Sequence, residues 1–117
     1  MEFATGSIAL LSTKNWKSIF SDNDVIQANY WVTPVVKTKF INGIFELSFS
    51  FETTKYQLTI YPNTPTSYNF SGVIICDNKD AGKVYLTLFQ SLHSVLLKGD
   101  WTEFGRNYDC IIELKKQ

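Results

Sequence analysis

The clearest pattern along the chain is an alternation of apolar and polar residues, which recurs in three consecutive runs between residues 83 and 116. Side chains that alternate with a period of two point to opposite faces of an extended strand, so each run is typical of a half-buried β-strand. The short segments 90–93 and 104–106 separate the runs and can reverse the chain direction. The pattern predicts an up-and-down antiparallel meander in this part of the chain.

The same alternation predicts strands nearer the N-terminus. Apolar and polar side chains alternate without exception from residue 45 to residue 52. The dipeptide Asn42-Gly43 before this run predicts a tight hairpin, because both residues accept positive φ. The β-forming stretch 25–41 is long for one strand and contains Pro34, which cannot donate to a ladder. We therefore expect this strand to be bent, bulged or broken near Thr33-Pro34.

A short helix is predicted over residues 13–20. Ser and Thr residues that can cap a helix precede Trp16, Ile19 and Phe20, which follow one another at helical spacing.

These elements predict a single all-β domain over residues 1–117, with about eight antiparallel strands in an up-and-down meander. Sequential strands with short reversals can close on themselves and so remove exposed edges, which favours a small β-barrel. A two-sheet β-sandwich would give much the same pattern and is the alternative. The distinction matters for function, because an eight-stranded barrel can hold side chains or one small ligand in its interior.

Composition agrees with a β fold and limits the partners. The chain has nine Phe, six Tyr and three Trp, residues that suit pleated, half-buried surfaces. Eleven basic and eleven acidic side chains cancel, so neither nucleic acid nor an anionic membrane is expected as a partner. No apolar run is long enough to span a bilayer, and the first residues lack the features of a signal peptide. We expect a soluble, cytoplasmic protein.

The residues that usually carry catalysis or bind metals are few. Cys76 and Cys110 fall on the core side of their strands and are expected to be free, buried thiols; a disulfide would require neighbouring strands. Two cysteines and one histidine give no metal-binding spacing, and we expect no metal and no cofactor. His93 lies in a predicted turn without a carboxylate beside it, so a catalytic base would lack an orienting group. The sequence leaves catalysis open but favours a non-catalytic role.

One hairpin near the C-terminus suggests a family. The segment from Gly99 to Tyr108 follows the pattern G-x-W-x-E-x-G-x-x-Y and resembles hairpins of small calycin barrels of the lipocalin and avidin type. The Gly-x-Trp that lipocalins carry before the first strand is missing, since Trp16 follows a candidate strand here. The resemblance implies a barrel that holds a small ligand and carries over no binding residue.

Five residues are candidate ligand contacts: Trp101, Tyr108, Phe70, Gln90 and Trp31. Trp101 and Tyr108 share the inward side of adjacent strands, where large aromatic residues either fill a core as a cross-strand pair or form a stacking wall. Gln90 would add one inward polar group, and Gly72 and Gly99 are expected to leave room beside the rings.

These features give two function hypotheses from different classes. The first is a non-catalytic barrel that binds a small apolar or neutral ligand. The alternative is a protein–protein interaction module or a subunit of a larger assembly, which would use the exposed aromatic residue of Tyr30-Trp31 or the loop 62–66. An enzyme ranks third, and the sequence does not indicate an oligomeric state.

Overall fold

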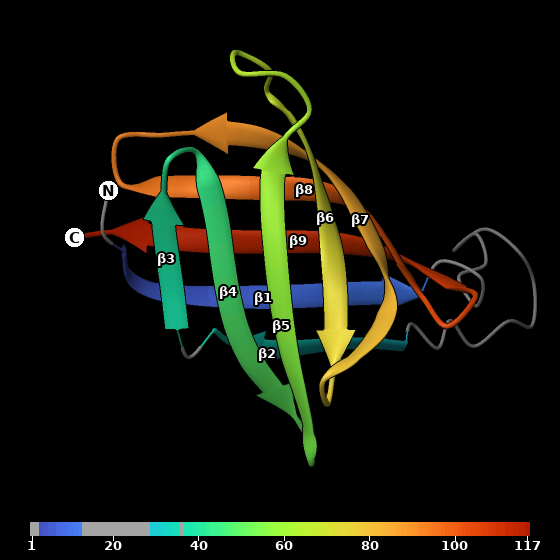
Figure 1. Ribbon diagram of the computed structural model, residues 1–117. Helices are drawn as coiled ribbons and strands as arrows, with labels where there is room; N and C mark the ends of the chain where they lie inside the picture. The colour runs from blue at the N-terminus through green and yellow to red at the C-terminus, as the bar shows by residue number, and fades with distance from the viewer. Residues whose placement is uncertain (1–2, 13–28, 36) are drawn as a thin grey trace, which may run out of the picture.

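The computed structural model describes residues 3–12, 29–35 and 37–117, and this part of the chain is all β (Figure 1). Its nine strands are β1 (Phe3–Ser12), β2 (Asn29–Pro34), β3 (Lys37–Ile41), β4 (Ile44–Phe51), β5 (Thr54–Pro62), β6 (Asn69–Cys76), β7 (Lys79–Gln90), β8 (Ser94–Glu103) and β9 (Arg106–Lys116). They form one sheet in the order β2-β1-β9-β8-β7-β6-β5-β4-β3, and every neighbouring pair is antiparallel. The helix predicted over residues 13–20 lies outside the described residues.

The two edge strands of the sheet, β2 and β3, are consecutive in the chain. A break follows Pro34, and the backbone N–H of Val35 donates to the carbonyl of Gly6 on β1 at 2.8 Å. The bend predicted near Thr33-Pro34 is therefore confirmed. Counted as one bent strand, β2 and β3 give the eight strands that the sequence indicated.

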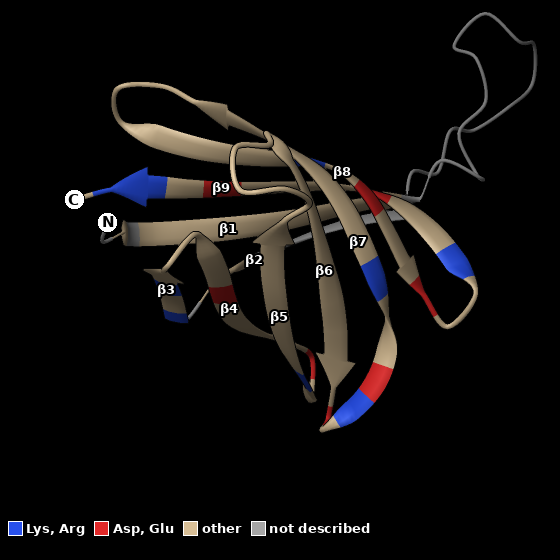
Figure 2. Cartoon of the chain, turned by 45° about the horizontal axis from the view of Figure 1, so that its top comes forward, with Lys and Arg blue, Asp and Glu red and all other residues tan. Residues whose placement is uncertain are grey.

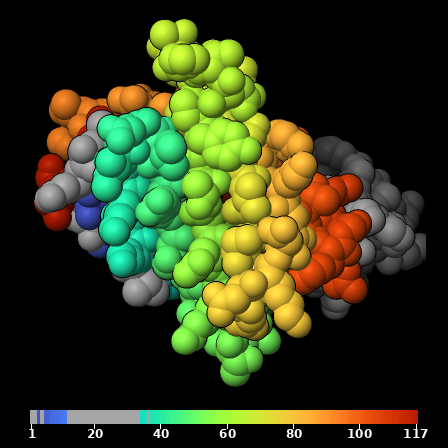
Figure 3. All heavy atoms as spheres, in the orientation of Figure 1, coloured from blue at the N-terminus to red at the C-terminus, as the bar shows by residue number. Residues whose placement is uncertain are grey.

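The sheet curls into a barrel-like shape with two layers. In Figure 1, β3 to β6 run across the front of β1, β2, β8 and β9, and β7 curves from one layer towards the other. The outer face of β3 to β7 is continuous, and the loop between β5 and β6 stands above it (Figure 3). Charged residues of both signs are spread over the strands, in keeping with the zero net charge (Figure 2).

Tight turns join most of the neighbouring strands. Asn42 and Gly43 have φ of 55° and 80°, as the predicted hairpin requires. The β8–β9 turn has the same form, with φ of 48° at Phe104 and 77° at Gly105. A bulky residue such as Phe104 is unusual at positive φ, and its ring is 68% exposed.

Alternate residues of each strand fill the interior. β4 and β5 place Phe45, Leu47 and Phe49 opposite Ile60, Leu58 and Tyr56, and all six side chains are buried. The residues between them face outwards and are mostly polar. The alternation seen in the sequence is thus the alternation between core and solvent.

Candidate functional site

A carboxylate with two aromatic hydrogen-bond donors lies at one end of the barrel-like sheet. Tyr56 Oη donates to Glu103 Oε2 at 2.8 Å, and Trp101 Nε1 donates to Glu103 Oε1 at 2.9 Å. Glu103 follows Trp101 by two residues on β8, so both side chains lie on the same face of the strand. Because Glu103 is the last residue of β8, its carboxylate lies where the interior meets solvent and is half-buried.

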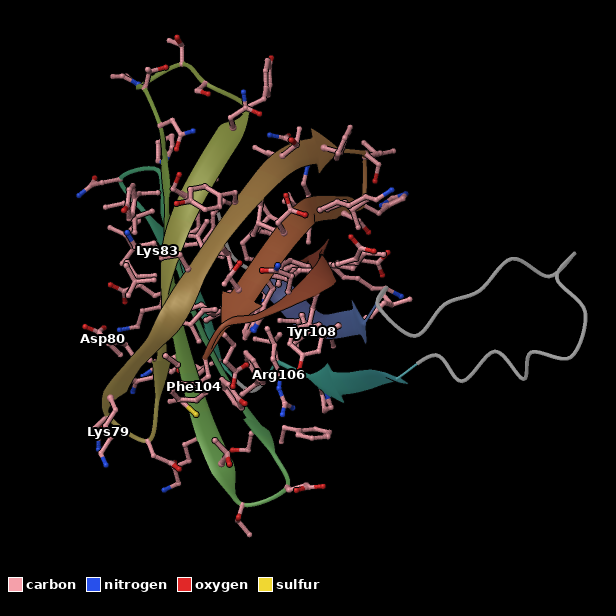
Figure 4. All side chains as sticks on the ribbon, turned by 90° about the vertical axis from the view of Figure 1, so that its right-hand side faces the viewer. Lys79, Asp80, Lys83, Phe104, Arg106 and Tyr108 are labelled. Atoms are coloured by element: carbon pink, nitrogen blue, oxygen red, sulfur yellow. The ribbon has the colours of Figure 1, made fainter. Side chains whose placement is uncertain are left out.

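Two hairpins come together at this end. The backbone N–H of Phe104 donates to the carbonyl of Ala81 at 3.0 Å and so ties the β8–β9 turn to β7. Figure 4 shows Phe104, Arg106 and Tyr108 on this side, with Lys79 on the neighbouring hairpin. Tyr108 lies directly opposite Trp101 on β9 and is half-buried.

Aromatic rings form the floor of the site. Phe49 and Tyr56 are cross-strand neighbours whose rings stack with centroids 4.9 Å apart and an interplanar angle of 4°. Trp101 lies 6.2 Å from Phe49 and 6.1 Å from Tyr56 and is fully buried. Its indole N–H would be costly to leave unpaired there, so the bond to Glu103 holds the carboxylate in a defined position.

The Tyr56 phenol and the Cys76 thiol, which lie beside one another at the site, both keep their protons. Burial, together with the hydrogen bond to Glu103 and its negative charge, raises the pKa of Tyr56, so the phenol remains a donor. Cys76 lies opposite Tyr56 on β6, and burial raises the pKa of its thiol. A protonated thiol and a protonated phenol provide no activated nucleophile.

The other candidates for catalysis and metal binding lie apart. His93 is exposed in the β7–β8 turn, at the opposite end of β8 from Glu103. Cys76 and Cys110 are both free; Cys110 is buried as expected, whereas Cys76 is half-buried. Among the described residues, no group of His, Cys, Asp and Glu side chains could hold a metal ion.

The structure brings together two of the five residues predicted to contact a ligand, Trp101 and Tyr108. Phe70 is buried against Phe45, with centroids 5.7 Å apart, and Gln90 is exposed at the end of β7. The polar group that Gln90 was expected to add to the interior is therefore absent. Trp31 pairs with Leu10 through its backbone, and its side chain is not among those described.

The room expected beside the inward glycines is also missing. A Cβ atom on Gly99 would lie 2.0 Å from the carbonyl oxygen of Tyr85. On Gly72 it would lie 2.7 Å from the carbonyl oxygen of Thr59 and from a methyl group of Val84. Neighbouring strands and side chains fill these positions, so the expectation of space was wrong.

Sequence reasoning missed Glu103 and Tyr56 as site residues. The signal was present, because Glu103 shares the inward parity of Trp101 and Tyr56 begins an inward-facing run. A carboxylate on the core side of a strand, two residues after a tryptophan, needs a hydrogen-bonding partner or an open end.

No protein-family model, curated protein sequence or solved structure matches this chain. Among the residues that the structure describes, no helix has the length and apolar character needed to cross a membrane.

Proposed function

We propose that this chain is a non-catalytic binding protein that takes a small, largely apolar ligand at the end of a closed barrel, beside Glu103. The observation that carries the proposal is the Glu103 carboxylate, held by Tyr56 and Trp101 at the end of an apolar interior. The hydrogen bonds from Tyr56 and Trp101 leave further acceptor sites on the Glu103 carboxylate, since an ionised carboxylate offers roughly four of them. The join between β2 and β3 supports closure of the barrel, because it links the two edges of the sheet.

The surroundings of Glu103 define the class of ligand. Tyr108, opposite Trp101, and Cys76, opposite Tyr56, are half-buried, whereas Arg106 lies opposite Glu103 on β9 and is exposed. A ligand that enters between the half-buried side chains therefore meets apolar surface and the Glu103 acceptor, with the Arg106 guanidinium at the exposed rim. We expect a compact apolar body, neutral overall, with a hydroxyl group that donates to Glu103.

Trp101 fluorescence tests the proposal. The chain has three tryptophans, so a parent protein in which Trp16 and Trp31 are replaced by Phe reports on Trp101 alone. The probes are toluene, benzyl alcohol and benzylamine, which share a ring: toluene has no donor, benzyl alcohol has a neutral donor, and benzylamine is protonated and positively charged at neutral pH. We expect benzyl alcohol to bind roughly 3–10-fold more tightly than toluene, the equivalent of one net hydrogen bond.

The matched variants are Glu103→Gln and Glu46→Gln. Glu103→Gln replaces the carboxylate with an amide and should remove most of the preference for benzyl alcohol and benzylamine. Glu46 is exposed on the outer face of β4, so Glu46→Gln should leave the preference intact. Unchanged emission with all three probes, or a preference that survives Glu103→Gln, would show that this end of the barrel is not the binding site.

An interaction module is the second candidate function. It is favoured by exposed apolar side chains at the opposite end, where the β5–β6 loop and the β7–β8 turn meet: Tyr68 at 71%, Phe89 at 51% and Leu92 at 83% exposure. The backbone N–H of Leu88 donates to the carbonyl of Tyr68 at 2.8 Å and brings these residues together. An interaction module without a ligand site would leave Trp101 emission unchanged in the probe series.

A further inference from the structure

A polar hollow lies on the outside of the barrel-like sheet, over β6, β7 and β8. It has a volume of about 310 Å³, and its lining includes the polar residues Asn63, Asn69, Tyr85, Thr87, Lys98 and Asp100. This volume is at the lower end of the roughly 300–1,000 Å³ that ligand sites occupy. The hollow lies on the other face of the sheet from Glu103 and does not depend on the function proposed above.

Strand register assembles the hollow. Thr87 lies opposite Asn69 on β6 and Lys98 on β8, which forms one outward-facing row. Tyr85 lies opposite Asp100 in the next outward-facing row. The hollow opens between the two rows, so most of its lining comes from strands, and Asn63 at the start of the β5–β6 loop completes it.

The two asparagines are fixed by their neighbours. Thr87 Oγ1 donates to Asn69 Oδ1 at 3.3 Å, and Ser71 Oγ donates to Asn63 Oδ1 at 2.5 Å. The backbone N–H of Asn63 also donates to the carbonyl of Asn69 at 2.9 Å, which anchors the start of the loop. Because the amide oxygens are engaged, the amide nitrogens remain as donors, and no described residue accepts from them.

Two charged side chains complete the lining without pairing. Lys98 and Asp100 lie on the same side of β8 and form no ion pair with the described residues. Their opposite charges cancel within the lining, and Asp109, exposed opposite Asp100 on β9, adds a negative charge beside it, so an anion is not favoured. A divalent cation is not favoured either, because Lys98 lies beside Asp100 and no group of His, Cys, Asp and Glu among the described residues could hold a metal ion.

We infer that this hollow binds a neutral pyranose sugar. Sugar hydroxyl groups both donate and accept, and so match the amide and ammonium donors and the Asp100 acceptor together. The Tyr85 ring, 53% exposed at the edge of the hollow, offers an apolar surface for the C–H face of a sugar ring and a hydroxyl at its tip. The polar groups fix orientation and the aromatic ring supplies apolar contact, as in other small-ligand sites.

Titration of the full-length ¹⁵N-labelled protein tests the inference. The probes are glucose, galactose, mannose and N-acetylglucosamine, each as the free sugar and as its methyl glycoside. We expect saturable shifts of backbone amides around the hollow with at least one of them, at roughly millimolar affinity because the site is open. Binding of the methyl glycoside would indicate the end of a glycan chain, and binding of the free sugar alone would indicate a free monosaccharide.

Paired variants separate this site from general surface effects. Tyr85→Ala and Asp100→Asn should each weaken binding about tenfold or more, the change expected for loss of one well-placed contact. The controls are Tyr61→Ala, an exposed tyrosine that does not line the hollow, and Asp80→Asn, an exposed aspartate of β7 that does not line it either. Both controls should bind as the parent does. The inference is overturned if no probe gives saturable shifts, or if Tyr85→Ala and Asp100→Asn bind as tightly as their controls.

Discussion

Gly99→Ala should destabilise the protein, although alanine normally suits a strand better than glycine does. The added Cβ would lie 2.0 Å from the carbonyl oxygen of Tyr85 and 3.0 Å from Cα of Leu86, both backbone atoms of β7. Cβ contacts shorter than 3.0 Å are essentially never seen, whereas this contact would be 2.0 Å long. The backbone of β7 must therefore move away by about 1 Å, which is 3.0 minus 2.0. Such overpacking costs roughly 1–3 kcal/mol. Each ladder hydrogen bond that is stretched adds roughly 0.5–1.5 kcal/mol.

With one ladder hydrogen bond stretched, these terms give a loss of roughly 0.5–4 kcal/mol, after subtracting the roughly 0.4–1 kcal/mol by which alanine stabilises the protein through its less flexible unfolded chain. Urea unfolding measures this loss directly, and a thermal scan should show a decrease in Tm of roughly 3–6 °C per kcal/mol. Gly105→Ala is the matched control, because a Cβ there meets nothing within 4 Å and only its φ of 77° is unfavourable. That strain costs roughly 1–2 kcal/mol. A Gly99→Ala protein as stable as the parent would refute the close approach of β7 and β8.

Two further predictions concern the core. Phe49→Ala should cost roughly 3–5 kcal/mol in urea unfolding, because it removes a ring that is 2% exposed and stacked on Tyr56; an unchanged midpoint would contradict the inward placement of Phe49. Burial raises the pKa of Cys110 above its ordinary 9.0, so the folded state keeps a proton that the unfolded state releases. The stability from this group is full below about pH 9 and falls above it by up to roughly 1.4 kcal/mol per pH unit. Cys110→Ala should make the alkaline decrease in unfolding free energy shallower, and an identical slope in both proteins would contradict a buried thiol.

The strands and their turns could be predicted because they depend on local patterns. Alternation over residues 45–52 identified β4, and the positive φ of Asn42 and Gly43 follows from residue types that tolerate it. The break after Pro34 was also a local consequence, since proline has no N–H to donate. The pairing of β1 with β9 was not local, because it depends on how far the whole sheet curls.

The predictions for the interior were wrong where a residue on the inward side of a strand was assumed to be buried or to leave space beside it. Gln90 has the inward parity of β7 but lies at the strand's last position, where the interior has ended, and is therefore exposed. Gly99 also has inward parity, but the sequence does not show how closely the next strand approaches a residue without a side chain. Glu103 is the converse case, because it was not predicted as a site residue although it faces the end of the core.

The position of Glu103 explains why a binding site at that end is physically reasonable. A carboxylate deep in the interior would cost several kcal/mol unless fully paired, whereas one at the last residue of β8 remains partly hydrated. The same strand carries Asp100 outwards to the hollow and Trp101 inwards to Glu103, because successive side chains point to opposite faces. Asp100→Asn should therefore leave the probe response of Trp101 unchanged, and Glu103→Gln should leave sugar binding unchanged. The two sites can consequently be confirmed or rejected independently of each other.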